Sequence, residues 1–317
     1  MITTIKIIFK IFAGIELRGG ELKSVIGLAA SRNKQRIFEY LLKKFDPALD
    51  LSYCQDFPNK SFLNEGRGLG TLKPYRMLEN GDTKVFEKIF FNYSKNLASA
   101  VYFDRHQEKL LADKAIKAPR LRDTIKGKNL TILLYEFWNL EKLPEDSAYP
   151  VLKSKTMELC RDLTSVREKP GYINPATGKK KIYNPKRDLF VQEFVKIERI
   201  AQTFPVYFQH LDLGEENVFA NDVIIDWDNS GYYNLGVDFG RLLLSHYILN
   251  QDVFLATYKA EVSDYHLKSN SGVPFDEFYP VVLFYFLILF HGHHATEDSV
   301  DQIGRVIEDF KGGRFVC

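Results

Sequence analysis

The stretch YFQHLDLGEENVFANDVIIDWDNSGYYNLGVDFGRL, residues 207–242, decides the fold of this chain. Acidic and amide side chains alternate in it with short apolar runs, of which Val-Ile-Ile at residues 223–225 is the most strand-like. Only nine positions (226 minus 217) separate Asn217 from Asp226. A turn at Asn221–Asp222 then has to reverse the chain between two short strands. The stretch therefore predicts a tight β-hairpin with Asn217 at its start and Asp226 at its end.

The polar residues of this stretch resemble the catalytic loop and metal-binding segment of protein-kinase-like phosphotransferases. His210, Asp212 and Asn217 form the pattern H-x-D-x-x-x-x-N, and Asp226 closes the apolar run. In such enzymes the first Asp orients the attacking hydroxyl, while the Asn and the second acid hold Mg²⁺ on the nucleotide phosphates. The resemblance implies that Asp212, with His210 beside it, is catalytic and that Asn217 and Asp226 bind the metal. The alternative is a β-hairpin followed by a turn rich in Asp and Asn, which are ordinary turn formers.

The stretch looks more like one branch of that fold than like kinases at large. No Arg follows His210, and Asp226–Asp228 stands where protein kinases have D-F-G. Residues 225–243 are similar to the I-D-[YW]-E-x-x-G-Y-x-x-x-x-x-D-[ILF] segment of the aminoglycoside phosphotransferase and choline/ethanolamine kinase superfamily. By this resemblance Asp238 matches the acid that braces the catalytic loop. The implied fold is α+β, two-lobed and protein-kinase-like, with a small antiparallel-sheet lobe and a larger helical lobe.

The composition is that of an ordinary globular protein, with 317 residues of which 45% are hydrophobic and 26% charged. A net charge of +2 gives no reason to expect a nucleic-acid partner. The three cysteines are scattered, so neither a disulfide framework nor a zinc site is indicated, and a cytoplasmic location is expected. Residues 1–14 contain two Lys and lack a cleavage site, and the apolar residues 280–290 are too few to span a bilayer. Peripheral membrane contact is not indicated, and a buried helix is expected at 280–290.

A nucleotide-binding lobe is expected before the catalytic loop, and the chain supplies its elements in order. The run GRGLG contains Gly66, Gly68 and Gly70, whose access to positive φ lets a loop cover phosphates closely. Asn80–Gly81 predicts a hairpin between two strand-like runs. The continuous apolar run of residues 129–137 predicts a buried strand. The spacing of GRGLG departs from G-x-G-x-x-G, and an ordinary turn is the alternative.

Lys88 is the candidate for the lysine that meets the nucleotide phosphates. It is flanked by apolar residues, and a Lys in such a setting needs a partner. Lys84, four residues earlier on the same strand face but next to the turn, is the competitor. In kinase-like folds a helix Glu pairs with this Lys, which makes Glu108, on the helix-like run of residues 94–114, the implied partner. A solvated strand Lys and a surface Glu are the alternative.

The linker after the buried strand is the segment that hydrogen-bonds adenine in kinase-like folds. Glu136, Phe137 and Trp138 are therefore candidates for nucleotide binding, with hinge packing as the alternative for the Trp. The chain divides into an N-terminal extension with a helix at 34–45, a small nucleotide-binding lobe, and a large lobe with the catalytic loop and the acceptor site. These three parts are residues 1–60, 61–137 and 138–317.

Together these features predict an ATP- and Mg²⁺-dependent phosphotransferase acting on a hydroxyl of an amino alcohol, an aminoglycoside-like compound or a saccharide. The fold alone cannot select the acceptor. The segment 167–187 carries seven Lys or Arg against one Glu, which favours an anionic glycan or lipid if the segment takes part; a solvated loop is the alternative. A nucleotide-binding protein without catalysis is the remaining alternative. It is disfavoured because every polar group that transfer requires is present: Lys88, Glu108, Asp212, Asn217 and Asp226.

Overall fold

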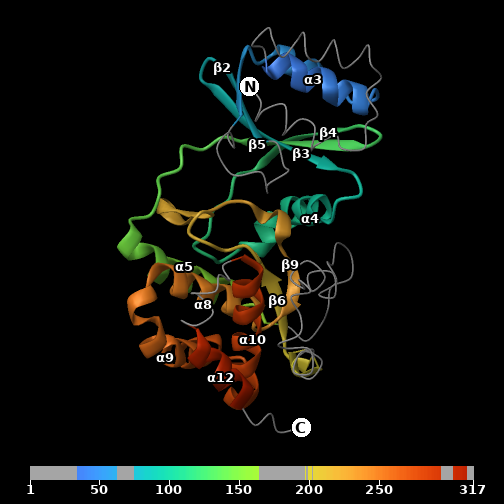
Figure 1. Ribbon diagram of the computed structural model, residues 1–317. Coiled ribbons are helices and arrows are strands. Elements are labelled where there is room, and N and C mark those ends of the chain that lie inside the picture. The colour runs from blue at the N-terminus through green and yellow to red at the C-terminus, as the bar shows by residue number, and fades with distance from the viewer. Residues whose placement is uncertain are drawn as a thin grey trace. The chain divides into compact units, whose positions relative to one another are not determined.

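The computed structural model describes residues 34–62, 75–163, 197–293 and 303–312, except Glu198 and Gln202. The chain divides into two compact units (Figure 1). The sheet unit comprises residues 1–97 and 119–139, and the helical unit comprises residues 98–118 and 140–317. The predicted α+β class, with an antiparallel sheet in one part and mainly helices in the other, is confirmed. Two predicted features lie outside the described residues: the glycine-rich run with Gly66, Gly68 and Gly70, and the basic segment 167–187.

The sheet unit is built on five antiparallel strands in the order β1-β2-β3-β5-β4. The predicted hairpin at Asn80–Gly81 is present, because β2 and β3 pair from Asn80 and Thr83 outward and Gly81 has a φ of +56°. The predicted strand after residue 129 is also present and is almost wholly buried. The strands are β1 (Asn59–Phe62), β2 (Tyr75–Asn80), β3 (Thr83–Phe91), β4 (Leu121–Lys126) and β5 (Leu130–Glu136).

Helix α3 (Lys34–Phe45) covers one face of this sheet (Figure 1). Its apolar residues Phe38 and Leu42 pack with Val85 and Ile89, which alternate along β3. Each such side chain contributes about 1.5–3 kcal/mol when it is fully buried. The division made from the sequence differs from the observed one in two places. Helix α3 and strand β1 are integral to the sheet unit rather than part of an extension, and most of the helix that carries Glu108 belongs to the helical unit.

A charged cluster is sealed beneath α3. Arg76 of β2 and Glu87 of β3 face each other in the strand register, and both side chains are 0% exposed. The guanidinium donates twice, from Nε to Oε1 over 2.7 Å and from Nη2 to Oε2 over 2.8 Å. Tyr53 Oη donates to the same carboxylate over 2.5 Å, and Arg76 Nη1 donates to Glu39 of α3 over 3.0 Å. The cluster therefore ties the helix to the sheet from inside the core.

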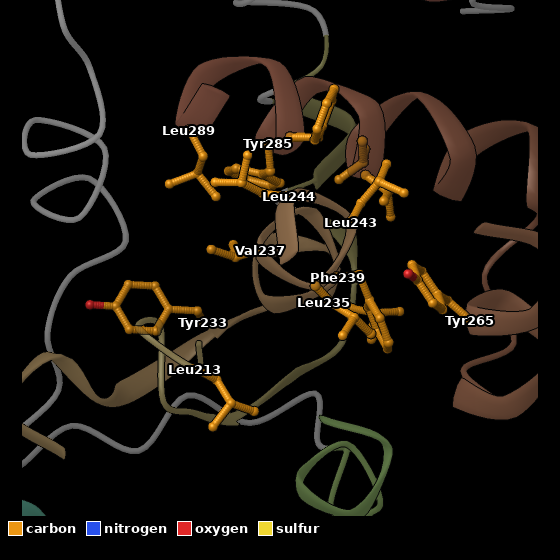
Figure 2. Close-up of a cluster of buried hydrophobic side chains, with 14 of the residues drawn as sticks. Leu213, Tyr233, Leu235, Val237, Phe239, Leu243, Leu244, Tyr265, Tyr285 and Leu289 are labelled. Atoms are coloured by element: carbon orange, nitrogen blue, oxygen red, sulfur yellow. The ribbon is translucent and has the colours of Figure 1, made fainter. Parts of the chain in front are cut away.

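The helical unit has its core around α8 and α10, whose apolar side chains pack against each other (Figure 2). A Cβ at Gly240 of α8 would collide with Tyr285 and with the backbone of Phe286, so glycine is what lets these helices approach. The helix expected at residues 280–290 is present and mostly buried. No helix within the described ranges is long and apolar enough to cross a membrane. The helices are α4 (Lys95–Leu110), α5 (Glu145–Leu159), α8 (Val237–Leu249), α9 (Gln251–Ser269), α10 (Phe275–His293) and α12 (Gly304–Gly312).

Candidate active site

The predicted catalytic loop leaves the short strand β6 (Val206–Gln209) and is braced by the start of α8. The backbone N–H of Leu211 donates to Asp238 Oδ1 over 3.1 Å, and the N–H of Asp238 donates to Gln209 Oε1 over 3.1 Å. Leu211 has a φ of 63°, a left-handed conformation that is strained for a Leu and persists only where its surroundings enforce it. Asp238 thus braces the loop, as the family resemblance implies.

His210 joins the loop to the segment that carries Asp226. Its ring is 0% exposed; Nε2 lies 2.8 Å from the carbonyl oxygen of Ile225, and Nδ1 accepts the N–H of Asp212 over 3.3 Å. Burial lowers the pKa of His210, so the ring is neutral with its proton assigned to Nε2. Backbone atoms engage both nitrogens and so hold the ring beside Asp212, and a catalytic role for His210 stays a prediction.

Asp212 stands at the exposed end of this arrangement. Its side chain is 34% exposed, and its two oxygens have different neighbours. Oδ1 forms an ion pair with Nη2 of Arg241 at 3.1 Å, whereas Oδ2 accepts a long 3.4 Å hydrogen bond from Nδ2 of Asn229. A carboxylate with one oxygen in an ion pair and the other in a long hydrogen bond is suited to accepting a proton from a bound hydroxyl.

The predicted hairpin between Asn217 and Asp226 is present. Strands β7 (Val218–Phe219) and β8 (Val223–Ile224) pair antiparallel, and the turn residues Asn221 and Asp222 have φ angles of 61° and 65°. The carbonyl oxygen of Asn217 accepts the N–H of Ile225 over 3.0 Å, which closes the hairpin beside Asp226. Asp226 itself is left-handed, with a φ of 65°. The two predicted metal ligands are therefore brought to the same end of one hairpin.

Both edges of the hairpin are covered by other segments of the helical unit. On one side Lys117 donates its N–H to Asp222 and accepts the N–H of Ile224, over 2.9 and 2.8 Å. On the other side the N–H of Ala220 donates to the carbonyl oxygen of Glu141 over 2.9 Å. Buried Lys155 of α5 reaches the Asp222 carboxylate over 2.6 Å. A hairpin this short is stable only with such support.

Trp227, the residue after Asp226, anchors the segment in the core. Its indole stacks on Phe103 of α4 with ring centroids 4.3 Å apart and planes 2° from parallel, and its Nε1 donates to the carbonyl oxygen of Ile224 over 3.0 Å. It also meets the ring of His210 edge-on at 4.6 Å. The predicted loop and the predicted metal segment are thus fixed to one aromatic cluster.

The donor set of the hairpin fits Mg²⁺. Asn217 Nδ2 donates to the carbonyl oxygen of Asp212 over 2.7 Å, which leaves the amide oxygen as its ligand atom. With Asp226 this gives one amide and one carboxylate oxygen, and Mg²⁺ usually completes such a shell with water and substrate phosphates. Accordingly, no group of three or more His, Cys, Asp or Glu in the described part of the chain forms a self-contained metal site.

Lys88 and its competitor Lys84 have different surroundings in the sheet unit. Lys88 is 6% exposed, and its Nζ lies 5.3 Å from the ring centre of Tyr75 and 5.9 Å from that of Phe86. By strand alternation it points away from the face that α3 covers. Lys84 is 37% exposed and pairs with Glu79 over 3.3 Å. The preference for Lys88 as the lysine in an apolar setting agrees with this difference in burial.

The structure places the other residues that are predicted to bind the nucleotide, and their roles stay predictions. Glu136 ends β5, its N–H donates to the carbonyl oxygen of Arg120 over 3.0 Å, and its carboxylate accepts Trp138 Nε1 over 3.2 Å. Phe137 lies between them, half-buried. Glu108 is exposed on α4 in the helical unit, whereas Lys88 belongs to the sheet unit. Their pairing stays a prediction.

Sequence reasoning missed Arg241 and Asn229, which within the described residues contact the Asp212 carboxylate. A signal for Arg241 existed, because it follows Asp238 by three positions and so shares a helix face with the brace of the loop. It also missed a small open hollow beside the loop. That hollow is lined by Gly214, Glu215, Glu216, Arg241, Leu244, Ser245, Ile248 and Leu249.

No protein-family model matches the chain, and no curated protein matches it in sequence. Solved structures do match. A thermostable mutant of the aminoglycoside phosphotransferase APH(4)-Ia is 14% identical with a TM-score of 0.49, covering 88% of this chain and 99% of that one. The choline kinase LicA from Streptococcus pneumoniae is 17% identical with a TM-score of 0.47, covering 87% and 99%. A microcompartment-associated aminopropanol kinase is 13% identical with a TM-score of 0.46, covering 82% and 92%.

All three belong to the superfamily that the loop resembles, that of the aminoglycoside phosphotransferases and choline kinases. With TM-scores below 0.5 and identities below 20%, this similarity does not identify a reaction for this chain.

Proposed function

We propose that this protein is an ATP- and Mg²⁺-dependent phosphotransferase that acts on a hydroxyl of a small molecule or saccharide. The observation that carries the proposal is the grouping of Asp212, Asn217 and Asp226 around buried His210. The grouping offers one partly exposed carboxylate for a hydroxyl and two oxygen ligands for a hard cation, all held by backbone hydrogen bonds. A turn with a purely structural role would need neither a partly exposed acid nor oxygen ligands held on a supported hairpin.

In the proposed reaction the acceptor oxygen bonds to the γ-phosphorus of ATP as the bond from that phosphorus to the β,γ-bridging oxygen breaks. ADP leaves with the electron pair of the broken bond, and the hydroxyl proton passes to the Asp212 carboxylate. Because phosphoryl transfer needs mainly positioning and charge stabilisation, Asp212 acts by orienting the hydroxyl as much as by taking its proton.

Mg²⁺ would be held by Asn217 and Asp226, and when bound it neutralises charge on the transferred phosphate. Lys88, paired with Glu108 in this proposal, would meet the phosphates, and the glycine-rich run with Gly66, Gly68 and Gly70 would also bind them. At the linker the N–H of Glu136 is already engaged by Arg120, so hydrogen bonds to adenine would come from the backbone of Phe137 and Trp138.

The acceptor would approach Asp212 beside a surplus of negative charge. Asp212, Glu215 and Glu216 bring three carboxylates to this side of the loop, and Arg241 pairs with Asp212 and Glu216. A neutral or cationic alcohol fits this charge better than the anionic glycan or lipid that the basic segment favoured. An amino alcohol or an aminoglycoside-like compound is therefore the first choice. A cytoplasmic location and the absence of a nucleic-acid partner stay predictions.

The direct test is a screen for ADP release from MgATP with ethanolamine, choline, 1-amino-2-propanol, kanamycin and neutral sugars as acceptors. Replacing the acid by Asp212→Asn should lower turnover on the best acceptor by roughly 10²–10⁴-fold, the range for a general base, while MgATP still binds. Calorimetry with MgATP measures the binding. Near-normal turnover of the variant would show that another group does the chemistry.

The same screen separates catalysis from binding alone. A chain that binds MgATP in the calorimeter yet releases no ADP with any acceptor, or with water, is a nucleotide-binding protein without catalysis. A chain that neither binds MgATP nor releases ADP refutes the proposal altogether.

A further inference from the structure

Arg241 makes an unusual contact at the proposed site. A single nitrogen, Nη2, lies 3.1 Å from Oδ1 of Asp212 and 3.2 Å from Oε1 of Glu216. The arginine side chain is 18% exposed, against 34% and 38% for the two acids. One nitrogen therefore forms an ion pair with the proposed catalytic acid and donates a hydrogen bond to a second acid four residues later on the same loop.

The shared contact distinguishes the two oxygens of Asp212. Oδ1 is attracted to the guanidinium as an ion pair at 3.1 Å, whereas the charge-assisted hydrogen bond of Nη2 is donated to Oε1 of Glu216 over 3.2 Å. The neutral donor at Oδ2, Asn229 Nδ2, is 3.4 Å away, near the limit for a hydrogen bond. An incoming hydroxyl can therefore replace the Asn229 hydrogen bond to Oδ2 with little loss of free energy.

The position of Arg241 along α8 determines where its side chain begins. The residue sits in the first turn and a half of α8, three positions after Asp238, whose carboxylate holds the N–H of Leu211 beside Asp212. The helix that braces the loop backbone therefore also carries the side chain that meets the loop acid. On the other side, the carboxylate of Glu216 folds back over Gly214, where a Cβ would collide with it.

We propose that Arg241 is a positioning residue for Asp212 and that Glu216 steers it. Arg241 holds Oδ1 so that Oδ2 faces the acceptor hydroxyl and takes its proton, and Glu216 keeps the guanidinium between the two acids. This inference rests on the proposed phosphotransferase function, but it concerns a residue to which neither the motif nor the matched structures assign a role.

The test is a double-mutant cycle on Arg241 and Glu216, with kcat and the two KM values measured on MgATP and the best acceptor of the screen. Arg241→Met should lower kcat by about 10–100-fold, because a displacement of about 1 Å of a catalytic group can cost 10²-fold, and should leave the KM for ATP unchanged. Glu216→Gln should lower kcat several-fold. In the Arg241→Met background, Glu216→Gln should have no further effect, since Glu216 acts only through the arginine.

Two further variants separate positioning from plain structure. Arg241→Lys should restore most of kcat, because one ammonium group can lie between both carboxylates just as Nη2 does. Glu308→Gln, which changes an exposed Glu of α12 outside the site, should leave kcat unchanged. Thermal unfolding checks that each variant folds. If Arg241→Met does not fold, Glu216→Gln against Glu308→Gln decides, since both of those side chains reach solvent.

The outcomes divide cleanly. Unchanged kcat in Arg241→Met, or an additive effect of Glu216→Gln in that background, overturns the inference while the phosphotransferase proposal stands. A wild-type chain that releases no ADP with any acceptor or with water overturns the proposed function, and the inference with it. A lowered kcat that Arg241→Lys restores, with a non-additive cycle, supports both.

Discussion

Each unit of this protein contains an arginine that meets carboxylates, and the two differ in every respect that matters for function. Arg76 in the sheet unit is 0% exposed and donates from two nitrogens to both oxygens of Glu87, which is equally buried. In the helical unit, one nitrogen of Arg241 meets two different carboxylates, whose side chains are 34% and 38% exposed. The first pair is further held by hydrogen bonds with Tyr53 and Glu39, whereas the second can be rearranged by a ligand.

The difference separates a charge pair that stabilises the fold from one that lies at the proposed active site. A buried bidentate pair stays in place because breaking it strands an ion in the core. A shared contact at the surface is weak by comparison, so a substrate can change it without unfolding the chain. The sheet unit thus has a buried bidentate ion pair beneath α3, and the helical unit has a partly exposed, shared one at the proposed active site.

The largest expected effect breaks the buried pair. Arg76→Met should destabilise the chain by about 3–5 kcal/mol, because it leaves the Glu87 carboxylate buried without its cation. Urea unfolding measures the change. Glu39→Gln, which removes the half-exposed outer partner on α3, should cost less than about 1 kcal/mol.

A double variant sharpens this prediction. Arg76→Met with Glu87→Leu replaces the ion pair by apolar side chains and should recover much of the lost stability, since such replacements are often neutral. If the double variant is as unstable as Arg76→Met, the cluster stabilises the unit through its bonds to Tyr53 and Glu39 rather than by matching charges.

Lys88 is the expected exception in the sheet unit, a buried charge that serves chemistry. Lys88→Met should lower turnover by about 10²–10³-fold, the usual cost of losing one preorganised donor, while the melting temperature stays close to that of the wild type. Lys84→Met, four residues earlier at the rim, should do little. Measured kcat for the two variants decides, and a damaging Lys84 change would move the phosphate lysine to the other end of β3.

Asp226 and Asp228 offer a similar contrast inside the helical unit. Asp226→Asn should weaken Mg²⁺-dependent ATP binding by at least about 10–100-fold, which is the loss that follows when a residue hydrogen-bonded to a metal ligand is changed. Asp228, which is 1% exposed, should act on stability instead, so Asp228→Asn should lower the melting temperature and leave MgATP affinity nearly intact. Calorimetry with and without Mg²⁺ measures both, and the reverse order would exchange the two roles.

The last effect is a pH dependence at Asp238, whose pKa burial raises to about 7 although the N–H groups of Leu211 and His210 oppose the rise. An unfolded Asp titrates near 3.9, so below that pH the carboxyl is protonated in both states and costs nothing. As the pH rises from about 4 to about 7, the unfolded chain ionises first and stability falls, by at most about 1.4 kcal/mol per pH unit. Above about 7 the dependence ends.

Asp238→Asn removes that titration while its side-chain oxygen still accepts the N–H of Leu211. Unfolding free energies of the variant should therefore fall less than those of the wild type between pH 4.5 and pH 7.5. Parallel curves for the two proteins would mean that Asp238 is ionised throughout and that its burial is compensated.

Local signals predicted a large part of this fold. Asn80–Gly81 and Asn221–Asp222 mark tight turns because their side chains and φ preferences suit reversal, and both hairpins are present. The apolar runs before residues 137 and 290 predicted a strand and a helix correctly, since each is long enough to bury itself. These features depend on neighbours within a few residues, which a single sequence displays.

Features that depend on distant contacts were not predictable in the same way. Arg76 and Glu87 look like surface charges of two strands, and only the helix packed over them turns that face into an interior. Arg241 meets an acid 29 positions earlier (241 minus 212), through a loop whose left-handed Leu211 no local rule would have placed. For the same reason, the division made from the sequence placed α3 and the start of β1 in an N-terminal extension.

The side chain of Gln209 has a consequence for how the loop can open. Its Nε2 donates to the carbonyl oxygens of Tyr233 and Asn234, while its Oε1 accepts the N–H of Asp238, whose own carboxylate holds Leu211. The amide protons of Leu211 and Asp238 can reach solvent only when this set of bonds parts. Their exchange is thereby linked to the opening of β9 (Gly231–Asn234) and the first turn of α8, so the loop behaves as part of that cooperative unit and not as a freely fluctuating segment.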